Sequence, residues 1–254
     1  MAYSDEMKRI AIFLFLLSFT ALTNSSPQKA PPAGSINAAK ILEGNLASTG
    51  GLSAHKEVVT FRASGDFGLT LTHPLGNYTF LYKAPKKDVL EVQLISHGMS
   101  WTGRRDERQI RRGSVQGAQM INGVGMEIVE QSLLSLLEWD IRGYEKIELV
   151  GRAQVDKRWA YAPRFTPRHG DQQVRYYDSE TFLLVRMDQV QRFKQANNIP
   201  ELGYAVTTYF RDSRQYGALK LPHQIAISRD AGDLMFELGD VKTGVEIPDT
   251  EFKD

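Results

Sequence analysis

The chain has 254 residues, a formal net charge of +1 and no cysteine. Its length suits one or two domains with a sizeable core, and its near-neutral charge argues against a general electrostatic attraction to nucleic acid or anionic membranes. The lack of cysteine excludes disulfides, thiolate metal sites, a cysteine nucleophile and lipid attachment at a signal-peptide cysteine.

A mostly apolar run near the N-terminus, residues 10–23, directly follows Lys8 and Arg9. A bilayer-spanning helix needs ~20 such residues, whereas a signal-peptide core needs ~7–15. We therefore expect residues 1–26 to be a signal peptide that is cleaved on export to the periplasm. Met7 is an alternative initiator, because a start there removes the acidic residues that precede the basic pair.

After a proline-rich linker at 27–34, one domain is expected to span residues 35–254. The pattern over 35–51 predicts a helix with Ser35 as N-cap. Its apolar stripe contains Ala39, Leu42 and Leu46, and the glycine pair at 50–51 ends it.

From residue 57 the apolar period changes to two, which predicts half-buried antiparallel strands joined by short turns. Tyr78, Phe80 and Tyr82 alternate with polar residues and should share one face. Leu90, Val92 and Leu94 repeat this pattern in the last strand of the group. The four predicted strands are 58–64, 67–73, 77–83 and 89–96.

The middle of the chain is different, because residues 101–125 are polar, rich in arginine and punctuated by glycine. We interpret this segment mainly as loop. Within it, 104–112 carries five arginines against two acids, which suits either a solvated loop or a contact with lipid headgroups or a partner protein. A helix is predicted over 126–140, with its main apolar stripe at Met126, Val129, Leu133 and Leu137.

A second series of strands fills the C-terminal half, with one further possible helix at 189–197. About eleven strands are predicted in total, so the expected fold class is α+β, a strongly curved antiparallel sheet whose apolar concave face is covered by helices. The strands of the second series are 146–155, 158–165, 173–178, 181–187, 203–212, 218–228 and 233–241.

Residues 209–228 place a polar cluster between two strand-like runs. Asp212 is interpreted as a turn residue rather than a catalytic acid. Gly217 can adopt the positive φ that closes a hairpin, and Pro222 suits an edge or first position of a strand.

No common catalytic or cofactor signature is present: G-x-S-x-G, G-x-G-x-x-G and G-K-[ST] are all missing. No two histidines have the spacing that presents two metal ligands on one face, and acidic residues concentrate at predicted turns. We expect no enzymatic activity, no metal and no cofactor. The five histidines are His55, His73, His97, His169 and His223.

The order of these segments resembles the outer-membrane lipoprotein-sorting family, which includes LolA-like, LolB-like and RseB-like proteins. The resemblance covers about residues 36–252. It depends on four stretches: AAKILEGNLASTGGLSA; YKAPKKDVLEV; ELVGRAQVDKRWAYAPRFTP with VRYYDSETFLLVRM; and TTYFRDSRQYGALKLPHQIAIS with FELGDVKTGVEIPDTEF.

The resemblance implies an incomplete β-barrel of about eleven strands with helices as a lid, an apolar cavity for lipoprotein acyl chains, and no enzymatic activity or cofactor. The expected function is periplasmic carriage or sensing of a lipid-like ligand by a monomer with at most peripheral membrane contact. The alternatives are a sensor or scaffold that binds another envelope protein and, third, an envelope hydrolase. The cavity wall is expected to contain Tyr78, Phe80, Tyr82, Leu133, Leu137 and Trp139.

Overall fold

The computed structural model describes residues 36–70, 73–85, 87–94, 100–106, 109–111, 123–138, 143–168, 171–193, 202–229 and 233–252. The expected signal peptide and linker lie outside these ranges. None of the helices within them is long and apolar enough to cross a membrane.

The helices of the described residues are α2 (Ala38–Ser48), α3 (Gly51–Glu57), α4 (Gly123–Leu137) and the short 3-10 helix η2 (Asp249–Phe252). Between and after them come the strands β1 (Thr60–Thr70), β2 (His73–Lys83), β3 (Lys87–Leu94), β4 (Ser100–Asp106), β5 (Gln109–Arg111), β6 (Tyr144–Val155), β7 (Arg158–Pro167), β8 (Gln173–Asp178), β9 (Leu184–Phe193), β10 (Leu202–Tyr216), β11 (Leu219–Arg229), β12 (Leu234–Glu237) and β13 (Asp240–Thr243).

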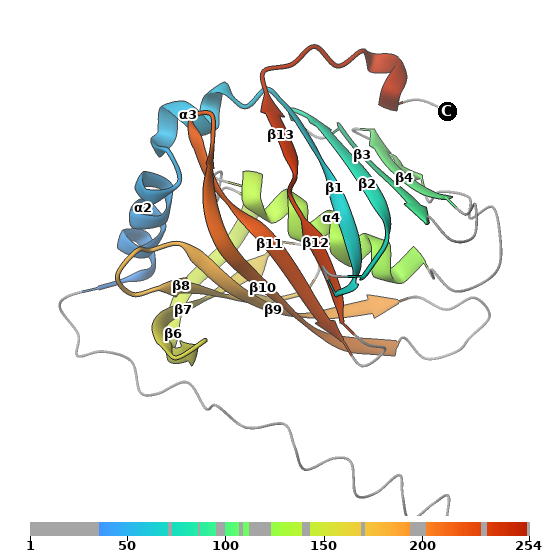
Figure 1. Ribbon diagram of the computed structural model, residues 1–254. Coiled ribbons are helices and arrows are strands. Elements are labelled where there is room, and N and C mark those ends of the chain that lie inside the picture. Colours follow the sequence, from blue (N-terminus) through green and yellow to red (C-terminus); the bar gives the residue numbers. More distant parts are fainter. Residues whose placement is uncertain are drawn as a thin grey trace, which may run out of the picture.

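These strands form one antiparallel sheet in the order β5-β4-β3-β2-β1-β12-β11-β10-β9-β8-β7-β6, and β13 pairs with β1. The sheet is open, because β5 and β6 stand at opposite ends of this order. It twists strongly and curls around α4 (Figure 1). The predicted fold class, a curved antiparallel sheet with covering helices, is confirmed.

The sheet has thirteen strands in the described residues, against about eleven predicted. The two strands predicted at 58–64 and 67–73 are one strand, β1, and the strand predicted at 233–241 is divided into β12 and β13. The prediction of loop for 101–125 was wrong where β4 and β5 form, since β4 pairs with β3 over Asp88–Gln93. Polar composition hides such a strand, because its stability comes from backbone pairing with a neighbour.

The first predicted helix is two helices. The side chain of Asn37 caps α2 by accepting a hydrogen bond from the Lys40 amide at 2.9 Å, whereas Ser35 lies outside the described residues. Gly50 and Gly51 have φ values of 124° and 81°, a region that favours glycine. They end α2 as predicted, and the chain turns there into α3.

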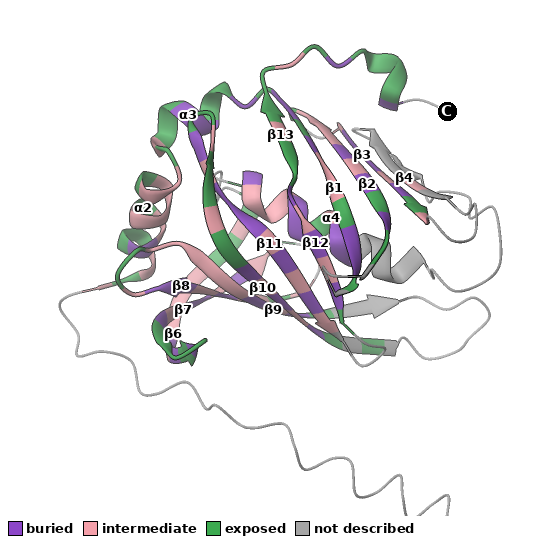
Figure 2. Ribbon diagram, viewed as in Figure 1, coloured by how far each residue is buried: buried purple, intermediate pink, exposed green. Residues whose placement is uncertain are grey.

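Three apolar clusters hold the layers together (Figure 2). In the largest, Leu133 and its neighbours on α4 pack on the concave face of β1–β3 and β9–β12. In the second, Ile41 of α2 packs on Phe165 and Tyr177 of β7 and β8. In the third, Phe252 of η2 covers Val89 on the opposite face of β3. The two helices α2 and α4 therefore cover different parts of the concave face.

The beginning of β9 contains a β-bulge. Tyr177 pairs with Leu184 and Tyr176 pairs with Arg186, so the register shifts at Val185. The extra residue brings Leu184 and Met187 to the same face, where both join the largest cluster. The strand predicted at 181–187 therefore begins only at Leu184 and continues to Phe193. The helix predicted at 189–197 was wrong as far as Phe193, because β9 pairs with β10 through that residue.

The polar cluster of 209–228 lies at a hairpin, but the turn is later than predicted. Tyr216 pairs with Leu219, and Gly217 has a φ of 59° in the two-residue loop between them. Asp212 lies inside β10 with a φ of 51° and forms an exposed ion pair with Arg214. Its interpretation as a turn residue was wrong, because the regular pairing of β10 and β11 continues past it.

Candidate functional site

Two adjoining cavities lie between the helices and the concave face of the sheet. The smaller chamber has a volume of about 230 Å³ and is lined by α2, α3, the end of α4, β6–β8, the segment before β9 with its first residue, and the β10–β11 hairpin. The larger chamber, about 620 Å³, is lined by α3 and the residues after it, the second half of α4, β2 and the segment after it, and the strands β6 and β8. The chambers form where α2 and α4, packed on separate clusters, leave a space between them.

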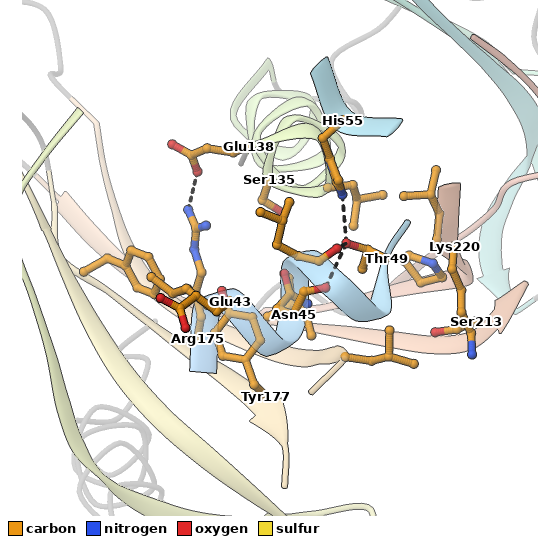
Figure 3. Close-up of a pocket in the computed structure, with 18 of the residues that line it drawn as sticks. Glu43, Asn45, Thr49, His55, Ser135, Glu138, Arg175, Tyr177, Ser213 and Lys220 are labelled. Atoms are coloured by element: carbon orange, nitrogen blue, oxygen red, sulfur yellow. Dashed lines mark hydrogen bonds and ion pairs between the residues drawn. The ribbon is translucent and has the colours of Figure 1, made fainter. Parts of the chain in front are cut away.

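Apolar side chains make up much of both chamber walls. In the smaller chamber, Leu42 and Leu46 of α2 line the wall together with Leu136 of α4. Leu183 and Leu184, at the start of β9, complete this apolar lining. Figure 3 shows α2 passing between the α4 side of this chamber and its sheet side. The larger chamber has its own apolar set: Val58, Val59, Tyr82, Ala84, Pro85, Leu134 and Leu137.

The wall shared by the two chambers is polar. Five residues line both cavities, and every one of them has a side chain that can form hydrogen bonds. They come from α3, from the end of α4 and the residue after it, from β6 and from β8, so four elements of the chain meet here. The shared residues are His55, Ser135, Glu138, Tyr144 and Arg175.

Arg175 is the central cation of this wall. Its side chain is only 4% exposed, and Nη2 donates to Glu138 Oε2 at 2.5 Å and to Tyr144 Oη at 2.6 Å. The guanidinium also donates to Gln173 and lies 4.3 Å from the centroid of the Phe165 ring. Burial by itself would lower the pKa of Arg175, but Glu138, Tyr177 and Tyr144 together outweigh it and raise the pKa. Arg175 is therefore a permanent positive charge inside the protein.

Tyr144 completes the arrangement around the carboxylate. Its hydroxyl donates to Glu138 at 2.8 and 2.9 Å and accepts from Arg175. Burial raises the pKa of Tyr144 well above its ordinary value, with Arg175 acting in the opposite direction. The phenol consequently stays neutral and remains a hydrogen-bond donor across the physiological pH range.

His55 forms the other side of the shared wall. The hydroxyl of Thr49 donates to the carbonyl of Asn45 at 2.9 Å, so it accepts from His55 Nε2 at 2.8 Å (Figure 3). Burial lowers the pKa of His55 below its ordinary value. His55 is thus a neutral donor that connects α3 to Thr49, the C-cap residue of α2.

The structure places the six residues expected at the cavity wall in different positions. Tyr82 and Leu137 line the larger chamber. Tyr78, Phe80 and Leu133 are at most 2% exposed, belong to the solid core under α4, and line neither chamber. Trp139 lies outside the described residues.

Sequence reasoning missed the polar wall and the contribution of β8. The period-two pattern of 173–178 shows that Arg175 and Tyr177 share a face, but it does not show which face points inwards. The leucines of α2 were recognised as one stripe, and only their place opposite α4 was unknown. No group of three or more histidine, aspartate or glutamate side chains that could hold a metal ion occurs among the described residues.

Comparison with solved structures identifies the fold. The structure of a LolA superfamily protein from Nitrosomonas europaea aligns with 87% of this chain, and the alignment covers 99% of that protein's chain. The TM-score is 0.53 and the sequence identity is 12%. For a DUF1329 family protein from Desulfovibrio piger, the alignment covers 85% of this chain and 96% of the other, with a TM-score of 0.46 and 13% identity. The MucA/MucB complex structure from Pseudomonas aeruginosa matches 82% and 99%, with a TM-score of only 0.22 and 9% identity.

Only the first of these similarities is high enough to support a conclusion. At 12% identity it shows the fold alone, so the chain has a LolA-like fold. No protein-family model matches the sequence, and no curated protein matches it either.

Proposed function

We propose that this protein is an exported binding protein of the cell envelope that carries or senses a lipid-like ligand. The ligand's acyl chain lies in the two chambers between α2, α4 and the sheet. The observation that carries the proposal is the pair of adjoining cavities with apolar walls. The larger chamber falls within the ~300–1,000 Å³ typical of small-molecule sites.

The energy of such binding follows from burial of the chain. Each methylene removed from water contributes ~0.8 kcal/mol, so about ten buried methylenes contribute ~8 kcal/mol before the cost of association is subtracted. This range corresponds to micromolar or weaker binding. It suits a protein that must release its ligand as well as hold it.

Two further observations support the proposal. The apolar run at 10–23 is consistent with export, and the LolA superfamily protein of similar fold indicates that this architecture occurs in that superfamily. A protein-binding sensor or scaffold would favour a closed core with an exposed apolar edge. The exposed large apolar side chains of the described residues instead occur in several elements: Leu52, Val59, Leu69, Leu75, Trp159 and Val190.

The experiment is ligand binding by the purified mature protein. Native mass spectrometry and lipid extraction should show a co-purified lipid, and a fluorescent fatty-acid probe should bind and be displaced by unlabelled fatty acid. Leu46→Trp fills the smaller chamber and should weaken binding of the probe about tenfold or more, since the added ring occupies the space of the chain.

Leu52→Trp is the matched control. Leu52 is 43% exposed on the neighbouring helix α3 and lines neither chamber, so this variant should bind the probe like the wild type. The absence of both co-purified lipid and probe binding would overturn the proposal. Capture of an envelope protein by a lipid-free sample would then favour the scaffold alternative.

A further inference from the structure

The polar wall between the two chambers has the chemistry of an acid-binding site. Arg175 and Tyr144 both direct donors at one carboxylate, that of Glu138, within 2.5–2.9 Å. A charged guanidinium and a neutral phenol that converge on two oxygens form a strong arrangement for a carboxylate or phosphate. In this protein, the arrangement lies at the junction of two apolar chambers.

The carboxylate at this position is the protein's own and comes from an accessible residue. Glu138 follows the last residue of α4, and its side chain is 35% exposed, whereas that of Arg175 is 4% exposed. A buried guanidinium requires a partner. Its partner, Glu138, lies at the end of α4, so the Glu138 side chain can turn towards solvent without disturbing the core under α4.

The larger chamber also has an excess of positive charge. Its wall contains two cations, Lys56 and Arg175, against one anion, Glu138, with His55 neutral. Lys56 is exposed on α3 and forms no ion pair with any of the described residues. An anionic group that enters the chamber would therefore meet one cation already neutralised and one that is available.

We propose that the preferred ligand is an acidic amphiphile, with a carboxylate or phosphate monoester next to its acyl chain, and that Glu138 occupies the position of this acidic group in the ligand-free protein. This inference rests on the proposed function, because the chain of the amphiphile lies in the chambers. On binding, the acidic group of the ligand replaces Glu138 at Arg175 and Tyr144. Lys56 adds a second, weaker attraction.

The proposal makes Glu138 a competitor of the ligand, which has an unusual consequence. Glu138→Gln preserves the shape of the side chain and can still accept from Tyr144, but it removes the charge that neutralises Arg175. The variant should therefore bind a long-chain fatty acid more tightly than the wild type, by roughly tenfold. Its affinity for the primary alcohol of the same chain length should stay unchanged, because the alcohol carries no charge.

The test is displacement of a fluorescent fatty-acid probe by four unlabelled competitors: a fatty acid, a lysophosphatidic acid, the alcohol matched to the fatty acid, and inorganic phosphate. Wild type, Glu138→Gln and Lys56→Gln are compared. Lys56→Gln should weaken both acidic lipids about two- to fivefold, as expected for one exposed charge pair, and should not affect the alcohol. Inorganic phosphate should not compete, because it has no chain.

Lys157→Gln provides the matched control for Lys56→Gln. It removes a lysine at the β6–β7 turn that lines neither chamber, so it should leave every affinity unchanged. If Glu138→Gln does not fold, the acid-to-alcohol preference of Lys56→Gln relative to Lys157→Gln decides the question.

The outcomes separate this inference from the proposed function. Equal affinity for acid and alcohol in the wild type, with no effect of Lys56→Gln, overturns the acidic ligand and leaves lipid carriage intact. Weaker binding of acid and alcohol alike by a folded Glu138→Gln variant would show a structural role only. Binding of no competitor at all refutes both proposals.

Discussion

Replacing Ser132 by alanine should destabilise the protein more than replacing Thr208 by valine, although each change removes one hydroxyl. Both side chains are 0% exposed, on α4 and β10 respectively, within the core that places α4 on the sheet. Ser132 Oγ donates to the carbonyl of Ile128 at 2.8 Å and lies 3.3 Å from Thr208 Oγ1. Because the proton of Ser132 is already used, Thr208 is the donor of the pair.

The magnitudes follow from which group is left without a partner. Thr208→Val removes a long neutral hydrogen bond and leaves no donor unsatisfied, so it should cost about 0.5–1 kcal/mol. Ser132→Ala leaves the Thr208 hydroxyl buried without its acceptor and should cost about 1–3 kcal/mol. The double variant should be more stable than Ser132→Ala alone, with a coupling energy of about 1 kcal/mol.

The assay is equilibrium unfolding in urea for the wild type, the two single variants and the double variant. Thermal unfolding is a second readout, in which 1 kcal/mol shifts the Tm of a domain of this size by about 2–4 °C. Additive effects of the two substitutions, or a Thr208→Val variant less stable than Ser132→Ala, would refute the reasoning, because either result means that the hydroxyls do not form the described donor and acceptor pair.

Three further predictions concern His55 of α3, Gly44 of α2 and Tyr176 of β8. Burial lowers the pKa of His55 in the folded protein, so its contribution to stability is present above its ordinary value of about 6.5 and is lost as the pH falls below it. His55→Gln, which keeps a donor for the neighbouring threonine, should show a smaller loss of urea midpoint than the wild type between pH 7.5 and 5.5; parallel pH profiles would contradict this. A Cβ at Gly44 would lie 2.6 Å from Cγ of Phe182, so Gly44→Ala should destabilise by about 1–3 kcal/mol despite the better helix propensity of alanine, and Phe182→Leu should partly suppress the loss in the double variant. Burial and Asp188 raise the pKa of Tyr176 to about 12, so the change in ultraviolet absorbance that Tyr176→Phe removes should occur near that pH, and the stability from this group should be lost as the pH rises from about 10 to 12; a titration near 10 would show that the ring is not buried as described.

The regular elements show how far local pattern reasoning extends. The alternation in 77–83 predicted a shared face for Tyr78, Phe80 and Tyr82, and all three face the α4 side of the sheet. The same is true of Leu90 and Val92 in β3. These predictions succeeded because the pleat of a strand is a property of the local backbone, whichever neighbour the strand has.

The failures have an equally physical origin. The polar composition of 101–125 concealed β4, whose formation depends on the free edge of β3. The end of β9 has a polar, helix-compatible sequence, yet it pairs with β10 along Val190 and its neighbours. The bulge at Val185 reverses the face of Leu184 relative to the simple alternation. In each case pairing with the neighbouring strand, and not the composition of the segment itself, decided the conformation.

The candidate site divides in the same way. The sequence by itself determined that Leu42 and Leu46 share a helix stripe, that Leu133 and Leu137 share another, and that the strands have an apolar face. Only the tertiary structure decided that Arg175, Glu138 and His55 meet at the wall between two chambers. These three residues belong to β8, the end of α4 and α3, and local sequence patterns carry no information about distances between such separate elements. The cavity exists because α2 and α4 pack on different clusters of one curved sheet, which is a property of the assembled layers and not of any segment alone.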